Sequence, residues 1–324
     1  MVLGVGSIEY GATKSGAQLI RQTGNLAFSG TEDLGGGLKA SFRLETSIGG
    51  AAGTPLAGAA ATTLGDRGAF LALESGKLGT LLVGRAASGI RGNFGAVGDV
   101  SRLAVPTGLS AAAGAQSAAG TTPAVAVGDG AARVIYGDAY SNQVAYQSPS
   151  ISGFTVTVGV APVEGNTSTS KDTMSYGVNY AQGPLAVRYN LTDVKAVADS
   201  GGVTGTGYKL TTLNGSYDLG VARVGITYQG TSMASGTNPG SAIALTANVP
   251  LGAGSIGLGY GKKSSTAAGD TRVGGDNVKQ MFVGYRHDLS KRTHAQVVYN
   301  KLDRQGATTT NDIKETFLLI GHSF

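Results

Sequence analysis

The sequence predicts an all-β fold: one domain over residues 1–324, built as a sixteen-stranded antiparallel transmembrane β-barrel with a long third loop folded into its lumen. Three observations indicate this fold. Apolar and polar residues alternate through most of the chain, short and long connections follow one another in turn, and a last alternating segment, 316–324, ends on the aromatic Phe324. A chain of this length can form one domain when it is all-β.

The strands are indicated by alternation with a period of two. In 154–160, Phe154 and three valines alternate with threonine and glycine, and in 185–191 four apolar residues alternate with Ala186, Arg188 and Asn190. Such alternation gives each strand one apolar and one polar face. The same pattern recurs in 223–229, 243–249 and 256–260.

The composition favours membrane strands over membrane helices. Hydrophobic residues make up 41% of the chain. No uninterrupted apolar run approaches the roughly 18 residues that a transmembrane helix needs. A strand that faces lipid on one side needs an apolar residue only at every second position. The 54 glycines show no collagen period and indicate turns and closely packed strands.

The connections alternate in length. Short turns, such as 33–37, 75–79 and 250–254, alternate along the chain with longer polar stretches, such as 162–172 and 193–208. Short turns at one end and long loops at the other are typical of outer-membrane barrels. The segments between the connections number about sixteen, and a barrel of that size encloses an aqueous channel.

One connection, at about 86–140, is much longer than the others. It has little regular alternation, and a loop of that length in a compact protein is usually functional or disordered. A wide barrel has room for such a loop inside its lumen. We therefore expect 86–140 to constrict the channel.

The residue inventory argues against several functions. Cysteine is absent, so thiolate metal sites are excluded. The three histidines, His287, His294 and His322, lack a metal-binding spacing, and no serine partner for a hydrolase is evident near His294. Lysine and arginine are scattered, which argues against nucleic acid as a partner. We expect no enzymatic activity, no cofactor and no metal.

The start of the chain lacks an export signal. No charged segment followed by an apolar segment precedes Val2. Because a barrel of the outer membrane must be exported, we expect this sequence to be the mature chain, whose signal peptide has been removed or replaced by Met1.

Five blocks resemble the general porins of Gram-negative bacteria, and most closely the trimeric porins of β-proteobacteria and Neisseria. They are 26–40 (LAFSGTEDLGGGLKA), 78–85 (LGTLLVGR), 141–149 (SNQVAYQSP), 289–293 (LSKRT) and 321–324 (GHSF). The blocks span nearly the whole chain in the family's order. The resemblance implies a homotrimer in the outer membrane, in contact with its lipid and lipopolysaccharide, with 78–85 directly before the inward-folded third loop.

The chain departs from the family at a few basic positions. Asn25 stands where members often carry arginine, and Gly321 and Ser323 flank His322 where members carry basic residues. Ala139 falls at the position of an arginine that lines some anion-selective members, with Arg133 nearby. These departures predict a weak rather than a strong preference for anions.

The candidate site residues are charges that would line the passage. A diffusion channel needs fixed charge along a narrow, wet path. In alternating strands, the charges that alternate with apolar residues are expected to point inward. Alignment with a basic pore-wall position of the family adds Arg67. Arg67 and Arg43 are the candidates for the constriction itself. The inward set on the strands is Lys39, Arg43, Glu45, Arg188 and Arg223.

The long loop carries a balanced set of charges. Three arginines are opposed by three aspartates, so we expect basic residues of the wall to determine the field. Each single charge could instead belong to a solvated loop or lie away from the narrowing. The loop charges are Arg91, Arg102 and Arg133 against Asp99, Asp129 and Asp138.

These observations predict passive diffusion of small hydrophilic solutes and ions, with size exclusion by the loop and electrostatic filtering by the wall. Two alternatives stay open. One is a plugged structural or adhesive barrel that acts through its surface loops. The other is a soluble, secreted all-β domain.

Overall fold

The computed structural model describes residues 2–10, 13–14, 18–49, 65, 68–86, 97, 99–103, 140–162, 172–194, 197–198, 204–205, 208–233, 240–264, 277–305 and 312–323. Within these residues, no helix is both long and apolar enough to cross a membrane. The strands are β1 (Val2–Tyr10), β2 (Thr13–Lys14), β3 (Gln18–Gly35), β4 (Leu38–Gly49), β5 (Gly68–Ser75), β6 (Gly79–Ala86), β7 (Tyr140–Gln147), β8 (Phe154–Ala161), β9 (Thr173–Gln182), β10 (Leu185–Val194), β11 (Val197–Ala198), β12 (Thr204–Gly205), β13 (Tyr208–Asp218), β14 (Arg223–Met233), β15 (Gly240–Leu251), β16 (Gly254–Ser264), β17 (Asn277–Asp288), β18 (Thr293–Gln305) and β19 (Ile313–His322).

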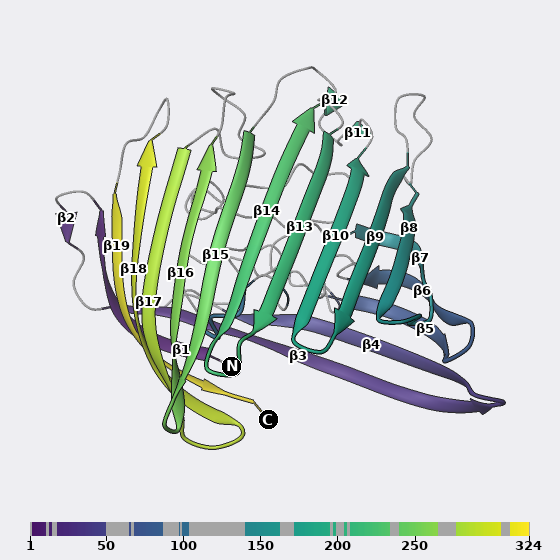
Figure 1. The fold of residues 1–324 in the computed structure, drawn as a ribbon, viewed down its shortest axis with the longest axis horizontal. Helices are drawn as coiled ribbons and strands as arrows, with labels where there is room; N and C mark the ends of the chain where they lie inside the picture. Colours follow the sequence, from purple (N-terminus) through teal and green to yellow (C-terminus); the bar gives the residue numbers. More distant parts are fainter. Residues whose placement is uncertain are drawn as a thin grey trace.

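The long strands pair with their neighbours in chain order, and every pairing is antiparallel (Figure 1). Pairing runs from β3 to β10, passes to β13 and continues to β19. Strand β19 then pairs with β1, from Val2↔Gly321 to Tyr10↔Ile313. Because β1 also pairs with β3, the pairings return to where they began. The predicted antiparallel all-β architecture is confirmed.

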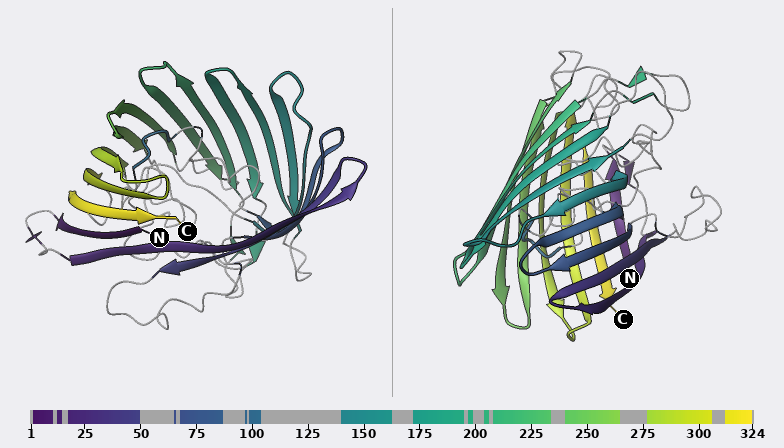
Figure 2. Two further views of the ribbon diagram at one scale, coloured as in Figure 1. Left: turned by 90° about the horizontal axis from the view of Figure 1, so that it is seen from below. Right: turned by 90° about the vertical axis from the view of Figure 1, so that its right-hand side faces the viewer.

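The sheet curves around a common centre, as the view from below shows (Figure 2, left). Its short turns gather at the end where both termini lie (Figure 1). In the turn from β3 to β4, Gly35, Gly36 and Gly37 all have positive φ, at 83°, 63° and 80°. Side chains other than hydrogen rarely tolerate these angles, so glycine allows this tight reversal.

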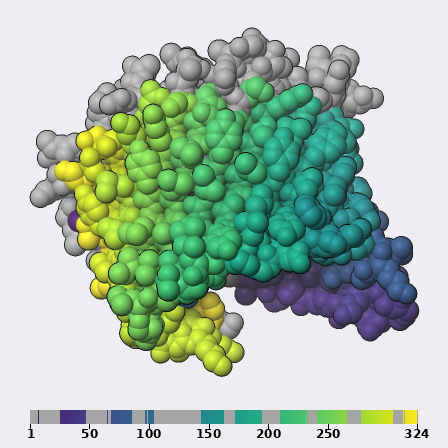
Figure 3. Space-filling view, in the orientation of Figure 1, coloured from purple at the N-terminus to yellow at the C-terminus, as the bar shows by residue number. Residues whose placement is uncertain are grey.

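The two faces of the strands differ in polarity, in the opposite sense to a soluble protein. On β15, Thr246 and Asn248 are buried while Leu245 is 48% exposed. On β14, Gln229 is buried while Tyr228 is exposed. Large apolar side chains thus face outward, on a wall that is continuous in the space-filling view (Figure 3). Contiguous exposed apolar surface marks contact with another phase or protein.

The inner face is not uniformly polar, contrary to the expectation from alternation. Phe282 of β17, Val298 and Leu302 of β18, and Phe317 and Leu319 of β19 are all buried. Full burial means that these side chains pack rather than line water, so this part of the inner face is a small apolar core.

Candidate functional site

A segment of the long connection between β6 and β7 lies inside the curve of the sheet, against the buried face of β15. The Val100 amide donates to Thr246 Oγ1 at 3.0 Å, and Asn248 Nδ2 donates to the Ser101 carbonyl at 3.2 Å. Asn248 Nδ2 also donates to Ser255 Oγ of β16 at 2.9 Å. Polar groups of the wall therefore satisfy the backbone of this segment, which would otherwise be buried without partners. We call residues 99–103 the docked segment.

Two glycines of the wall make room for the docked segment. A Cβ at Gly257 would lie 2.6 Å from Leu103 Cγ and would also overlap the Ser101 carbonyl oxygen. A Cβ at Gly284 would lie 2.8 Å from Leu103 Cδ1. Both distances are far below normal carbon–carbon contact, so only glycine at these positions lets Leu103 seat against β16 and β17.

The docked segment lies on the far side of the ring from the strand that precedes it. Strand β16 is equally far from β6 in both directions along the pairings. The chain leaves β6 at Ala86 and reaches β15–β17 by Asp99. The end of β6 and the docked segment, two described parts of this connection, are therefore separated by eight steps along the strand pairings.

An ion-pair cluster fixes the end of the docked segment. Arg102 and Arg286 both reach Asp288: Arg102 Nη2 lies 3.0 Å from Asp288 Oδ2, and Arg286 Nε lies 2.8 Å from Asp288 Oδ1. Arg102 has a φ of 62°, an uncommon value for a side chain of this size. Arg102 of the loop thus pairs with an aspartate of the wall.

Asp99 stabilises the docked segment from within. Its Oδ1 accepts hydrogen bonds from the Ser101 amide at 3.1 Å and the Ser101 hydroxyl at 2.7 Å. Burial raises the pKa of the Asp99 carboxyl above its usual range, and the two hydrogen bonds from Ser101 partly offset that rise. Asp99 thus stabilises the local backbone conformation of the docked segment.

Strand β4 carries the charges that parity pointed inward. Arg43 and Glu45 lie on the face opposite the exposed Phe42 and form an ion pair, with Nη2 and Oε2 2.8 Å apart. Ser41, on the same face, donates to Glu74 of β5. Lys39 is exposed near the short turn.

Arg188 and Arg223 occupy different depths of the same face. Arg188 of β10 is 6% exposed and donates to Asn179 of β9. Arg223, at the start of β14, donates to Ser216 Oγ of β13 at 3.2 Å. Arg188 is therefore part of the buried wall, whereas Arg223 lies near its rim.

Sequence analysis missed several charges on the inner face: Glu74, Arg286 and Asp288, described above, and two that are more deeply buried. Lys263 of β16 and Glu315 of β19 are each 4% exposed. Glu315 Oε2 accepts from Asn300 Nδ2 at 2.7 Å, and Asn300 Oδ1 accepts from Gln280 Nε2 at 2.8 Å. From Phe317 to Ile320 the residues that follow Glu315 are apolar on both faces of the strand, so alternation gave no indication of its direction.

The remaining predicted site residues lie outside the described part of the chain. They are Arg67, Arg91, Asp129 and Arg133, and the loop charge Asp138 also lies there. Across the ranges that the structure describes, no group of three or more His, Asp or Glu residues is placed to hold a metal ion. What the described site offers is a polar, charged inner wall with a loop segment docked against it.

Known proteins share this fold and part of this sequence. A family model described as Gram-negative porin matches residues 2–307. The chain is 30% identical over 302 residues to outer membrane porin protein 32 of Delftia acidovorans, and the match covers 89% of this chain and 75% of that protein.

Among solved structures, an anion-selective porin from Comamonas acidovorans aligns with a TM-score of 0.70 at 23% identity, covering 100% of this chain and 98% of the other. The trimer form of in-vitro folded OmpT from Vibrio cholerae aligns with a TM-score of 0.61 at 13% identity, covering 98% and 96%. The chain belongs to the Gram-negative porin family, whose members are channels of the outer membrane rather than enzymes.

Proposed function

We propose that this chain forms a closed, sixteen-stranded barrel, made of β1, β3–β10 and β13–β19, through which small hydrophilic solutes and ions diffuse passively. The inversion of polarity across the wall carries the proposal. Hydrogen-bonding side chains such as Asn248 and Gln229 face inward and apolar ones such as Leu245 face outward. In lipid, a closed sheet satisfies all backbone groups, and a polar lumen holds water.

The long connection narrows this passage, and its docked segment is bonded to the wall. The docked segment is held by Thr246, Asn248 and Asp288 on strands that stand opposite β6. A loop segment fixed against the inner wall reduces the cross-section of the passage and so sets an upper size for solutes. The region 86–140 is therefore the constricting loop in our proposal.

The filter has a weak preference for anions. Basic residues exceed acidic ones by five over the whole chain. The charges of the described inner face include Arg43, Arg188, Arg223, Lys263 and Arg286 against Glu45, Glu74, Asp288 and Glu315. A low-dielectric wall strengthens the field of such charges. The similar porin from Comamonas acidovorans is named anion-selective, and in our proposal Arg67, Arg91, Arg102 and Arg133 belong to the same filter, with Asp99 and Asp129 opposing them.

The functional unit is a homotrimer in contact with outer-membrane lipid. A trimer form is known for the similar OmpT of Vibrio cholerae. Here β5 offers apolar residues on both faces, with Leu71 67% exposed and Ala72 buried. An outward apolar face of this kind suits either lipid or a second subunit.

Solute release from proteoliposomes tests the proposal. Vesicles loaded with sugars of increasing size should release the small ones and retain the large ones, because the docked segment limits the bore. Release of no sugar from vesicles with verified insertion would contradict it. That outcome would favour the plugged structural or adhesive barrel, in which the loops close the lumen.

A further inference from the structure

Charged side chains gather on β17 and β18 where these two strands meet their short turn, at the end of the sheet where both termini lie (Figure 1). Arg286 and Asp288 lie on β17, and His294 of β18 is the direct cross-strand partner of Asp288. The docked segment adds Arg102, whose guanidinium reaches the same aspartate. We call these four residues the mouth cluster.

The mouth cluster lies on the inner side of the sheet. On β17 every second residue from 278 to 284 is buried, and Arg286 and Asp288 continue that series. On β18 every second residue from 296 to 302 is buried, and His294 continues that series toward the turn. Since side chains alternate between the two faces of a strand, all three residues of the wall point into the space that the sheet curves around.

His294 lies over a glycine of the next strand. Its cross-strand partner on β19 is Gly321, and a Cβ at Gly321 would overlap His294 Cε1. The imidazole therefore rests on the backbone of β19, which offers no side chain at this position. The charged groups that act on the ring are Asp288 and Arg286 of β17, Arg102 of the docked segment and the amino terminus of the chain.

The mouth cluster has an excess of positive charge. Asp288 shares its carboxylate between two guanidinium groups, with Arg286 Nε at 2.8 Å and Arg102 Nη2 at 3.0 Å. Two arginines and one aspartate give a net charge of +1, and a protonated His294 raises it to +2. The side chains of Arg102 and Arg286 are 47% and 22% exposed, so an ion in water can approach both.

We propose that the mouth cluster is a second anion filter at the short-turn end of the passage, and that protonation of His294 strengthens it. Histidine is the side chain that ordinarily changes its charge between pH 5 and pH 8. The ligands are small monovalent anions such as chloride, which the field of one or two positive charges attracts. This inference rests on the proposed channel and adds to it a residue that determines selectivity.

The loop and the wall build this filter together. Arg102 belongs to the docked segment, whereas Arg286 and His294 belong to strands that the chain forms more than 180 residues later. Asp288 joins the two parts, because it binds Arg102 as well as Arg286. The same contact that holds the docked segment on the wall therefore places its positive charge beside His294.

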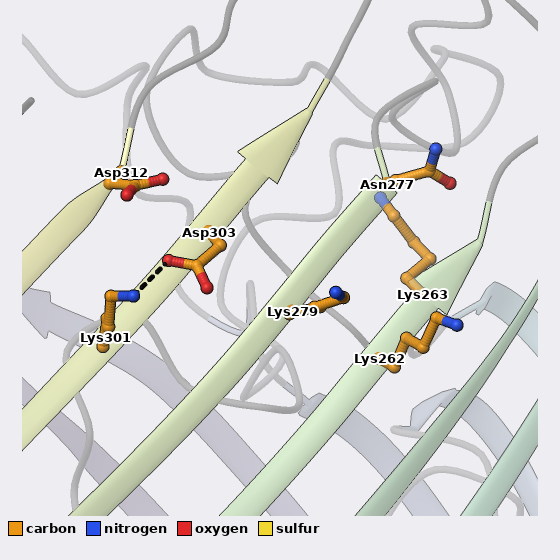
Figure 4. Close-up of a pocket in the computed structure, with 7 residues that line it drawn as sticks. All are labelled: Lys262, Lys263, Asn277, Lys279, Lys301, Asp303 and Asp312. Atoms are coloured by element: carbon orange, nitrogen blue, oxygen red, sulfur yellow. Dashed lines mark ion pairs between the residues drawn. The ribbon is translucent and has the colours of Figure 1, made fainter.

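The test is the reversal potential of the purified full-length protein in a planar bilayer with a potassium chloride gradient, at pH 8 and at pH 5. The variant H294Q is neutral at both values, and H294K is positive at both. H287Q is the matched histidine control, because His287 lies on the outward side of β17, with Nδ1 3.1 Å from Tyr285 Oη. K279Q is the charge control, because Lys279 lies on the outward side at the other end of β17, in the groove of Figure 4.

From pH 8 to pH 5, the anion-to-cation permeability ratio of the wild type should rise by about two- to fourfold, the effect of one unit charge about 10 Å from an ion in water. H287Q and K279Q should keep this rise. H294Q should lose it, and H294K should show at pH 8 the ratio that the wild type shows at pH 5. Single-channel conductance close to that of the wild type identifies each variant as folded.

A rise of wild-type size in H294Q would overturn the proposal, and so would a rise that disappears in D99N alone. Asp99 is the competing group, because burial raises the pKa of its carboxyl and its protonation would shift the potential in the same direction. If H294Q does not insert, equal ratios for H294K and the wild type at pH 8 would also overturn it.

The wild type separates this inference from the channel itself. Conduction with the same permeability ratio at pH 8 and pH 5 would overturn the role of His294 and leave the channel intact. A silent bilayer after verified insertion would overturn the proposed channel, and this inference with it.

Discussion

The Arg43–Glu45 pair is the best-defined pair of opposite charges on the inner face of β4. The pair is partly exposed to solvent, with 41% of the Arg43 side chain accessible. Exposed ion pairs contribute at most about 1 kcal/mol to stability. The importance of this pair therefore lies in the field that a passing ion meets, and its two members can be changed separately.

Arg43→Gln should shift the permeability ratio toward cations, and Glu45→Gln should shift it toward anions. A unit charge about 10 Å from an ion in water changes its energy by ~0.4 kcal/mol. Removing one charge should therefore change the anion-to-cation ratio by about two- to fourfold. The measurement is the reversal potential in a salt gradient, with Lys77→Gln in a short turn as the control. Shifts of the same sign in both variants would exclude the pair from the filter.

Parity identified the direction of Arg43, Glu45 and Arg188 because each sits in a strand with one clearly apolar face. Glu315 could not be oriented in this way, since its neighbours Phe317 and Leu318 are apolar on both faces. The partner of Arg102 could not be predicted either. Asp288 is 186 positions away, and no local pattern links the two.

At the scale of elements, the seat of Leu103 on β16 and β17 determines where the long connection lies. Gly257→Val should push the docked segment off the wall, because the new side chain would occupy the space of Leu103 and Ser101. Overpacking of this kind costs about 1–3 kcal/mol. Single-channel conductance should rise as the segment moves away.

The matched control is Gly215→Val on β13. A Cβ there meets only Ile226 Cγ2 of the described residues, at 3.4 Å, and faces outward. Its conductance should equal that of the wild type. Unchanged conductance in Gly257→Val, with a folded barrel, would mean that the docked segment does not limit the passage.

Most strands could be predicted from alternation, because a sheet with lipid on one side and water on the other enforces a period of two. The short hairpin of β11 and β12 could not, since two residues are too few to show a period. The docked segment also escaped sequence analysis. Its geometry depends on glycines and amides of strands that are distant in sequence.

For the whole molecule, the outward apolar face should behave as a lipid contact. Leu245→Arg, in the middle of β15, should lower the free energy of unfolding from lipid vesicles by about 2–4 kcal/mol. Leu219→Arg, exposed in the turn before β14, should cost much less. Denaturant titration of refolded protein in vesicles measures both. Similar losses in the two variants would contradict a membrane position for β15.

The central claim is that the ring of strands encloses a wet, weakly anion-preferring path. Current through a planar bilayer containing the purified wild type, with a tenfold salt gradient, tests it most directly. The account predicts stepwise conductance, in groups of three if the homotrimer inserts as a unit. It also predicts a reversal potential whose sign shows that anions permeate more readily than cations. A silent bilayer after verified insertion would contradict the channel, and a cation-selective potential would contradict the assignment of basic residues as the filter.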